Sequence, residues 1–281
     1  ILQIFGLAYF IFALWNLRLA VLILPLFFAT YLLKFDVNGV PFPLVEVIIY
    51  VTFFAFFLRT AREFFMRKLN WKYFIAPFKS PLWLGVLGIV VAGVISVFIT
   101  PQSVVMADGN TIFYGRKIAL GILKSWIIAP TLMLILFACV MRTSKDMALA
   151  LSSYVVVSVF LASWGVYQAL TGQYITPDAR ASGPFNSANY LALFITPALF
   201  YALVRFRDFY LMRHESWMAK IFHFLKRDSA DRQRGRFFLA IAWALGCLLL
   251  FFGLLFTKSY AAFLAFFIGG LIWVALQRKI W

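Results

Sequence analysis

Residues 237–257 read FFLAIAWALGCLLLFFGLLFT, a run that contains no charged side chain. A helix that crosses the hydrocarbon core of a bilayer needs about 20 apolar residues, and this run meets that requirement. Arg236 precedes it, and the pair Lys258 and Ser259 separates it from a second apolar run at 260–276. The stretch therefore predicts two successive transmembrane helices joined by a short turn.

The same pattern recurs along the whole chain. Of its 281 residues, 64% are apolar, 34 are Phe and only 10 are acidic, which is far from the composition of a soluble domain. Apolar runs bounded by charged or turn residues lie at 1–15, 18–34, 44–58, 81–100, 118–140, 147–169, 190–206, 237–257 and 260–276. We therefore expect an all-α fold, a polytopic bundle of about nine spanning helices that forms a single transmembrane domain over residues 1–281.

Basic residues in alternate loops predict the orientation of this bundle. Lys and Arg number 20 on one side, against five on the other side and one, Lys124, within an apolar run. Cytoplasmic loops carry the excess of Lys and Arg, so the richer side, with the basic loop 205–236, is predicted to be cytoplasmic. That loop is either solvated or an amphipathic helix on the anionic inner leaflet. Because topology explains most of the net charge of +16, we expect no nucleic acid partner.

A polar stretch, RASGPFNSANY at 180–190, lies on the opposite side between two apolar runs. Its Gly-Pro pair predicts a turn, and Ser187 or Asn189 is placed to cap the helix that follows. A helix N-terminus with Arg180 beside it is suited to bind an anion such as phosphate. The alternative is an ordinary capped loop in which Arg180 pairs with Asp178.

The spacing of five residues here resembles the motif of the O-antigen ligase and polymerase superfamily of bacterial membrane proteins. The motif reads Arg-x-x-Gly-x-Phe-x-x-x-Asn-x-x-Ala, met here by Arg180, Gly183, Phe185, Asn189 and Ala192. The segment LLFTKSYAAFLAF at 254–266 resembles a second family stretch, in which Thr-x-Ser-Arg precedes a small-residue helix at a short outer turn. Weaker likenesses extend over most of residues 18–276.

The resemblance implies transfer of an oligo- or polysaccharide from a polyprenyl diphosphate carrier to a lipid A core, a growing glycan or a protein. The reaction would take place at the outer face of the cytoplasmic membrane, among membrane lipids. Cations must then stabilise the departing diphosphate, and we assign Arg180 and Lys258 to this catalytic role. The residues expected to bind substrate are Lys124, Arg116, Gly183, Asn189 and Ser259. We expect neither a metal nor a cofactor, because the sequence has no P-loop and no Cys/His metal spacing.

The chain departs from the family pattern in two places. Tyr260 stands where the family commonly has Arg, and Lys258 lies two residues earlier. Family members also continue beyond the helix that 260–276 matches, into a further helix, an outer loop with a functional histidine and closing helices. The chain is therefore expected to be either part of a longer protein, with the base that deprotonates the acceptor in the missing part, or a shortened member without activity.

Lys124 and Arg116 each allow two interpretations. A buried ammonium is costly in lipid, so an intramembrane lysine such as Lys124 is a candidate functional residue. Because it lies near the start of its helix, it could also extend to the outer headgroups. Arg116 either joins a cationic cluster at that surface or contacts lipid headgroups.

Two other classes of protein share these features. A transporter or flippase of a lipid-linked glycan would have the same topology, with more polar residues in several mid-membrane helices. A non-catalytic membrane partner is the other alternative. The sequence does not separate a ligase, a polymerase and a protein glycosyltransferase from one another.

Overall fold

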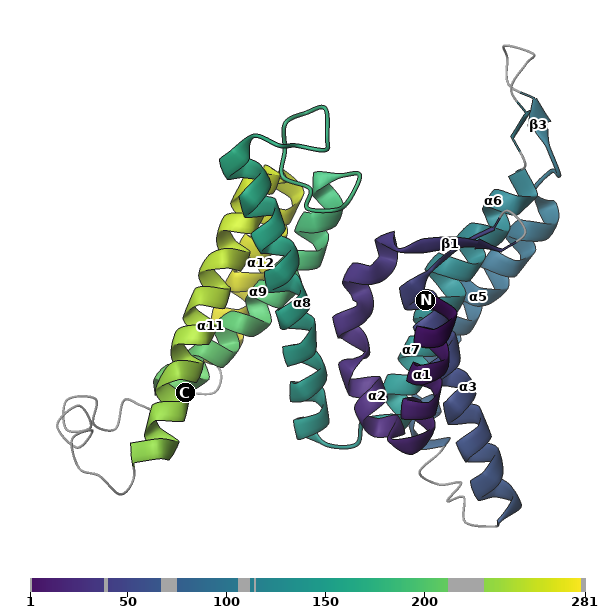
Figure 1. Cartoon of the computed structure of the whole chain (residues 1–281), viewed down its shortest axis with the longest axis horizontal. Helices are drawn as coiled ribbons and strands as arrows, with labels where there is room; N and C mark the ends of the chain where they lie inside the picture. The colour runs from purple at the N-terminus through teal and green to yellow at the C-terminus, as the bar shows by residue number, and fades with distance from the viewer. Residues whose placement is uncertain are drawn as a thin grey trace. The chain divides into compact units, whose positions relative to one another are not determined.

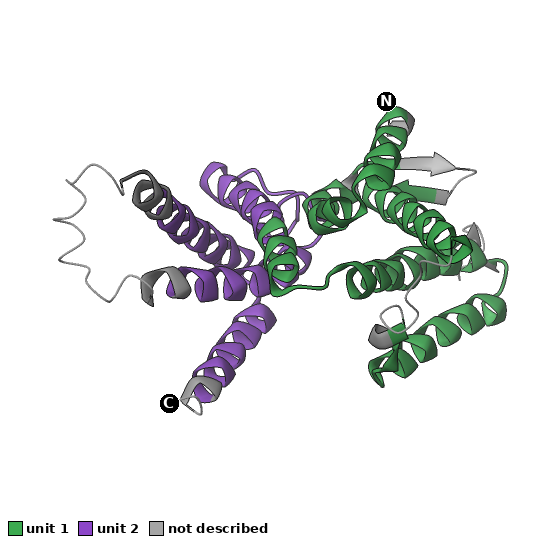
Figure 2. Cartoon of the chain, turned by 90° about the horizontal axis from the view of Figure 1, so that it is seen from below, with its two compact units in different colours: residues 1–153 green, residues 154–281 purple. Residues whose placement is uncertain are grey.

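The computed structural model describes residues 2–37, 40–66, 75–105, 112–113, 115–211 and 230–278. The contacts divide the chain into two compact units, Ile1–Ser153 and Tyr154–Trp281, which Figure 2 shows in different colours. Most of the basic loop predicted at 205–236 lies outside the described residues.

The first unit is built from helices and two short hairpins (Figure 1). Its helical elements are α1 (Leu2–Trp15), α2 (Leu17–Ile23), the 3₁₀ helix η1 (Leu24–Leu32), α3 (Leu44–Phe65), the 3₁₀ turn η2 (Ala76–Lys79), α5 (Leu82–Ile99), α6 (Gly115–Ile122), the π-helical segment η3 (Leu123–Ile128) and α7 (Ala129–Val140). The antiparallel hairpins pair β1 (Lys34–Val37) with β2 (Val40–Pro43), and β3 (Val104–Val105) with β4 (Ile112–Phe113).

Four long helices lie in the described part of the second unit. Helix α8 (Ser144–Thr171) begins in the first unit and continues into the second, where α9 (Ala188–Leu211), α11 (Ala230–Thr257) and α12 (Tyr260–Arg278) follow. A loop, residues 172–187, joins α8 to α9, and residues 258 and 259 separate α11 from α12. The expected all-α fold is confirmed, with the two hairpins as small additions that the sequence did not predict.

Six helices in the described part of the chain are long and apolar enough to cross a membrane, as in a multi-pass membrane protein. They are Leu44–Phe65, Leu82–Ile99, Gly115–Val140, Ser144–Thr171, Ala188–Arg207 and Phe238–Thr257. The other three predicted runs correspond to shorter apolar helices, Ile4–Trp15, Leu17–Tyr31 and Tyr260–Ala275. The predicted count of about nine spans is therefore not confirmed.

The run 18–34 differs most from the single regular helix that we predicted. Asn16 caps α2 by accepting a hydrogen bond from the Leu19 N–H at 3.1 Å. Pro25 then lies in the first turn of η1, and its ring removes one backbone donor and crowds the preceding turn. The run is therefore a short α-helix followed by a 3₁₀ helix.

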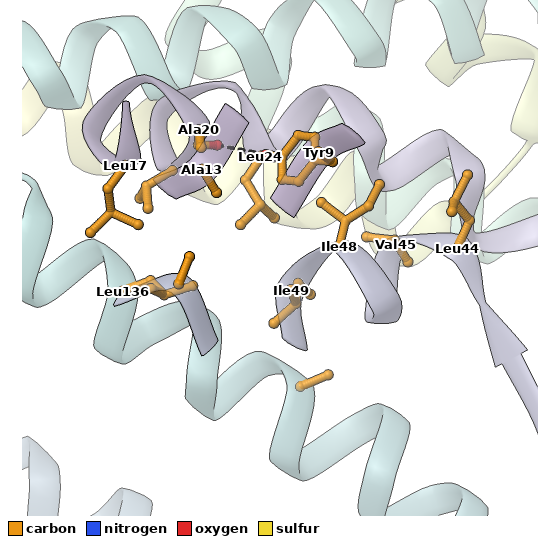
Figure 3. Close-up of a cluster of buried hydrophobic side chains, with 13 residues drawn as sticks. Tyr9, Ala13, Leu17, Ala20, Leu24, Leu44, Val45, Ile48, Ile49 and Leu136 are labelled. Atoms are coloured by element: carbon orange, nitrogen blue, oxygen red, sulfur yellow. Dashed lines mark hydrogen bonds between the residues drawn. The ribbon is translucent and has the colours of Figure 1, made fainter. Parts of the chain in front are cut away.

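A cluster of buried side chains holds the first unit together (Figure 3). Its members come from α1, α2, η1, α3 and α7, and those labelled in the figure are Tyr9, Ala13, Leu17, Ala20, Leu24, Leu44, Val45, Ile48, Ile49 and Leu136. Ala13 and Ala20 are fully buried, and such small side chains let helices approach closely. The Tyr9 hydroxyl donates to the Ala20 carbonyl at 2.9 Å, which satisfies its one buried polar group.

Glycines set the close packing of the second unit. A Cβ on Gly253 of α11 would lie 2.8 Å from the Ala162 Cβ of α8, and one on Gly165 of α8 would lie 2.9 Å from Leu191 of α9. A Cβ on Gly269 of α12 would come within 2.7 Å of the Phe200 ring of α9. These contacts bring four helices together beneath loop 172–187.

Candidate functional site

Gln168, near the end of α8, fixes the centre of loop 172–187. Its side-chain oxygen accepts hydrogen bonds from the backbone N–H groups of Ser182 at 3.1 Å and Gly183 at 2.8 Å. Its amide nitrogen donates to the Gly183 carbonyl at 2.7 Å. Only 2% of Gln168 is exposed, so one buried side chain satisfies three backbone groups of the turn.

Gly183 is required by the shape of this turn. Its φ is +57°, in the left-handed region that favours glycine. A Cβ at this position would also lie 3.4 Å from the Leu161 carbonyl oxygen. Gly183 therefore shapes the loop, and it is buried, so its backbone is not open to a ligand as we expected for a substrate-binding residue.

Arg180 connects three separate parts of the second unit. Its Nε donates to the Thr257 carbonyl at 2.7 Å, at the end of α11. Its Nη1 donates to Asp178 Oδ2 at 3.2 Å and its Nη2 to Asn189 Oδ1 at 3.0 Å. A guanidinium has five N–H donors, so two of them have no partner among the described residues. The side chain is 22% exposed, so a ligand can reach part of it.

The turn between α11 and α12 lies directly against this loop. The Ala181 N–H donates to the Phe256 carbonyl at 3.0 Å, next to the bond from Arg180 to Thr257. These two bonds use carbonyls that the end of a helix leaves without an intrahelical partner. The structure thus brings together the two sequence segments that carry the family resemblance, although about 75 residues separate them.

Lys258 and Ser259 occupy opposite environments in that turn. Lys258 has an exposed side chain and a φ of +49°, an uncommon conformation for a residue with a Cβ. Ser259 is 5% exposed, and its backbone N–H donates to the Thr257 hydroxyl at 3.4 Å. Of these two predicted site residues, Lys258 is therefore the one whose side chain can meet a ligand.

The N-terminus of α9 completes the site. The Asn189 N–H donates to the Ser187 hydroxyl at 3.3 Å, so Ser187 provides the cap, one of the two that we predicted. The Asn189 side chain instead binds Arg180. Asn189 is therefore a partner of the arginine, and its position is fixed by the first turn of the helix.

Asp178 is the carboxylate of the site. The Thr176 hydroxyl and the Arg180 guanidinium hold the pKa of the Asp178 carboxyl below its ordinary value. Its side chain is 50% exposed. Ala179, between the two charged residues, has a φ of +49°, and the Thr176 hydroxyl donates to the Arg180 carbonyl at 2.9 Å. The ion pair that we considered as the simpler interpretation of Arg180 is therefore present.

Lys124 and Arg116, the other two predicted site residues, lie in the first unit. Lys124 Nζ is 2.6 Å from Glu46 Oε2 and donates to the Pro41 carbonyl at 2.7 Å, and its side chain is 16% exposed. It also lies 3.9 Å from the centre of the Phe42 ring. Arg116 is half-buried, and its Nε has no hydrogen-bond partner among the described residues. The sequence did not predict the Glu46 pair, because 78 residues separate the two side chains.

An open hollow of about 580 Å³ lies beside the loop, against α8. It is lined by Phe160, Ser163, Trp164, Tyr167, Gln168, Gln173 and Ile175. Three of its aromatic residues lie at positions i, i+4 and i+7 of α8, a spacing that puts them on one helix face. That spacing is visible in the sequence, but we did not assign a role to it.

No group of three or more His, Cys, Asp and Glu side chains that could hold a metal ion occurs among the described residues. The chain matches no known family model, no curated protein and no solved structure.

Proposed function

We propose that this protein transfers a glycan from a polyprenyl diphosphate carrier to an acceptor at the outer face of the cytoplasmic membrane. The acceptor class is a glycan, a lipid or a protein. The observation that carries the proposal is Arg180, a fixed and partly exposed guanidinium with two N–H donors unused among the described residues.

The chemistry of the leaving group explains why such an arginine is useful. When the glycosyl bond breaks, negative charge develops on the diphosphate, and donors that are already in place stabilise it without reorganisation. Thr257 and Asn189 fix the direction of the Arg180 guanidinium. Its remaining donors suit phosphate oxygens, for which arginine is preferred because of its planar fork.

Lys258 is proposed as the second cation. It follows directly after Thr257, the residue whose carbonyl accepts from Arg180, and its side chain is exposed. A lysine supplies a compact positive charge rather than paired hydrogen bonds. We therefore assign geometry to Arg180 and added charge to Lys258.

Lys124 is assigned a different task. Its ammonium already has a carboxylate partner in Glu46 and a carbonyl partner in Pro41. The Lys124 side chain is only 16% exposed and its partner Glu46 only 4%, so a diphosphate has little access to this ammonium. We propose that Lys124 fastens η3 to hairpin β1–β2 and to α3, and that Arg116 contacts lipid headgroups.

The orientation rests on the distribution of charge. The basic residues counted in the sequence put loop 172–187 on the side that is poor in Lys and Arg, which is the outer side of a cytoplasmic membrane. A polyprenyl-linked donor presented on that face would have its diphosphate at the depth of the helix ends.

Transport of a lipid-linked glycan is the second candidate function. The buried ion pair of Glu46 and Lys124 favours it, because charged residues inside the membrane often mark the path of a substrate or ion. A transporter would move the donor between leaflets without consuming it.

The test is a transfer assay on the full-length gene product in proteoliposomes. Polyprenyl-diphosphate-linked glycan and candidate acceptors are supplied, and the glycosylated acceptor and the released lipid diphosphate are both measured. We expect transfer by the wild type and at least a hundredfold loss with Arg180→Ala and Arg180→Lys. Arg142→Ala is the matched control, because Arg142 is an exposed arginine just before α8, in the first unit, and is not one of the residues that bond to Arg180.

Two outcomes would contradict the proposal. Normal transfer by a folded Arg180→Ala variant would remove the assigned role of the arginine. Movement of the intact donor across the bilayer, with no acceptor modified, would favour the transporter. Thermal unfolding in detergent shows whether each variant is folded.

A further inference from the structure

We infer that Glu46 is a proton-binding site, and that a proton taken up there releases Lys124 from hairpin β1–β2. Both residues lie in the first unit, so the site works whether or not glycan is transferred at loop 172–187. The observation that carries the inference is one carboxylate oxygen, Glu46 Oε1. It is buried and has no hydrogen-bond partner among the described residues.

The two oxygens of the Glu46 carboxylate lie in unequal surroundings. Oε2 accepts a hydrogen bond from the Lys124 ammonium at 2.6 Å. Oε1 is shielded from solvent and receives no hydrogen bond within the described part of the chain, and the Glu46 side chain is 4% exposed. Buried polar groups are normally paired, and a buried ion that lacks partners is costly. The ionised carboxylate is therefore only half satisfied.

A proton is the partner that suits this oxygen. Protein atoms cover Oε1, so a hydrated metal ion or a polar ligand has no access to it. A proton needs no space of its own. Once it binds, the carboxyl is neutral, and an unpartnered oxygen of a neutral group costs much less to bury than one of an ion.

Opposing contributions leave the Glu46 carboxyl able to exist in both forms. The Lys124 ammonium favours the ionised form by its opposite charge. The N-terminus of α3 favours it too, because Glu46 lies in the first turn of that helix. Burial and the unpartnered oxygen favour the neutral form. The position of the Lys124 ammonium therefore decides which form prevails.

Hairpin β1–β2 holds the other side of the Lys124 ammonium. Its Nζ donates to the Pro41 carbonyl at 2.7 Å and lies 3.9 Å from the centre of the Phe42 ring, both in β2. The side chain is 16% exposed, and a long lysine stem can carry its charge to water. When Glu46 is neutral, only a carbonyl and an aromatic ring hold the ammonium. A proton on Glu46 therefore allows Lys124 to turn outward and leave β2.

The backbone at Lys124 is held separately from its side chain. Lys124 lies in the π-helical segment η3, and its carbonyl accepts from the Ala129 N–H and from the Tyr50 hydroxyl at 3.3 Å. Single π-helical turns often occur at functional sites. Tyr50 lies one turn after Glu46 on α3, so α3 binds the Lys124 carbonyl and the Lys124 ammonium through different residues. The backbone can stay fixed while the ammonium is released.

The other ionisable side chains that the structure describes around this pair have their own surroundings. Helix α3 packs against α1, α2, η1, α7 and β2, and η3 packs against α5, α6 and α7. Neither β2 nor α5 contains an ionisable residue. On α3 itself, Arg59 and Glu63 pair with each other near the opposite end of the helix. The remaining groups are Tyr9, which donates to Ala20, Arg18, which pairs with Asp146, Tyr31, which lies 5.2 Å from the Lys34 ammonium, Cys139 of α7, Arg62 of α3, and Arg116 and Lys117 of α6.

The step balances as a proton transfer. The Lys124 ammonium passes a proton to Glu46 Oε2 along their 2.6 Å hydrogen bond, so an N–H bond breaks and an O–H bond forms. The neutral amine takes a proton from water as it turns outward. The net change is one proton gained from water by Glu46, with Lys124 again an ammonium.

The experiment measures protonation and release separately on the full-length protein in lipid nanodiscs. Infrared difference spectra recorded during acidification detect the carbonyl stretch of a protonated carboxyl. We expect a band that shifts in Glu46→Asp and disappears in Glu46→Gln. Labelling with an amine-reactive reagent, read by mass spectrometry, reports the accessibility of Lys124, with the exposed Lys258 as the internal reference.

Glu46→Gln has the charge of the protonated form at every pH. We expect it to raise the ratio of Lys124 to Lys258 labelling roughly tenfold to a hundredfold at neutral pH, the effect of losing one hydrogen bond between charged groups. The wild type is expected to approach the same ratio at the pH where the infrared band appears. If Glu46→Gln does not fold, the wild-type ratio at neutral and acid pH tests the release, and Glu46→Asp tests the origin of the band.

Glu63→Gln is the matched control. Glu63 is a carboxylate of the same helix, 3.5 Å from Arg59, with a side chain that is 46% exposed. We expect this variant to keep the wild-type band and the wild-type labelling ratio. Replacing K⁺ by Na⁺ at constant pH and ionic strength should leave the ratio unchanged, whereas a change would show that the carboxylate binds a metal ion instead of a proton.

Two further results would overturn the inference. One is the absence of a Glu46 band at every pH at which the protein remains folded. The other is equal Lys124 labelling in the wild type and in folded Glu46→Gln, which would show that the charge of Glu46 does not hold the ammonium. Neither measurement involves a glycan donor, so the failure of this inference and the failure of the proposed transfer can be told apart.

Discussion

Replacing Gln168 by leucine should release loop 172–187 without removing any residue proposed to meet substrate. The Gln168 side chain makes three hydrogen bonds to the backbone of Ser182 and Gly183. A buried hydrogen bond contributes about 1 kcal/mol net, and an unpaired buried group costs at least as much. The change should therefore favour local opening of the loop by about 3 kcal/mol, roughly 150-fold in the opening equilibrium.

Amide hydrogen exchange measures this opening directly. We expect the Ser182 and Gly183 amides to exchange roughly 150-fold faster in Gln168→Leu, by the same conversion, while the amides in the middle of α11 keep their protection. Ser163→Ala is the control on the same helix, because the Ser163 hydroxyl bonds to the Val159 carbonyl within α8. Equal protection of the loop in Gln168→Leu and the wild type would refute the role that we give to Gln168.

Three further predictions test other parts of the structure. Lys258→Gly should raise the free energy of unfolding by about 1 kcal/mol, because glycine adopts the φ of +49° without strain. The same variant should lower the transfer rate at least tenfold. A fully active variant would contradict the role given to the Lys258 ammonium. Glu46→Ala should lower the melting temperature in detergent because it leaves the Lys124 ammonium without its carboxylate. The double variant Glu46→Leu and Lys124→Met should recover much of this loss. If Glu46→Ala alone is as stable as the wild type, the ion pair is dispensable. Gly253→Ala should lower the free energy of unfolding by about 1–3 kcal/mol, because its Cβ would lie 2.8 Å from Ala162 of α8. Gly85→Ala should be neutral or stabilising, because a Cβ there has nothing within 4 Å. Equal melting temperatures for the two variants would refute the close packing at Gly253.

Much of the helical fold could be predicted because spanning helices are set by long apolar runs. The run predicted at 260–276 corresponds to Tyr260–Arg278, and that at 147–169 to Ser144–Thr171. The break in 18–34 was visible in principle at Pro25. Hairpin β1–β2 was missed because each strand has only four residues and the second strand, VPFP, contains two prolines.

The site was predictable only in part. The motif pointed to Arg180 and Asn189, which the structure places in contact. Gln168 was missed because a single polar residue in an apolar run carries no local signal of its partner. Its role appears only when the loop folds back onto α8. Pairs that are distant in sequence depend on tertiary packing, which a single sequence does not reveal.

The bond from Arg180 to the Thr257 carbonyl has a consequence for biosynthesis. The two residues are 77 positions apart, and a ribosome adds about 5–20 residues per second. Arg180 is therefore synthesised roughly 4–15 seconds before its partner. During that interval the loop lacks its contact with α11, so it reaches its final shape only after α11 is complete. A nascent chain halted before residue 257 should accordingly expose loop 172–187 to protease, and a chain extended past α12 should protect it.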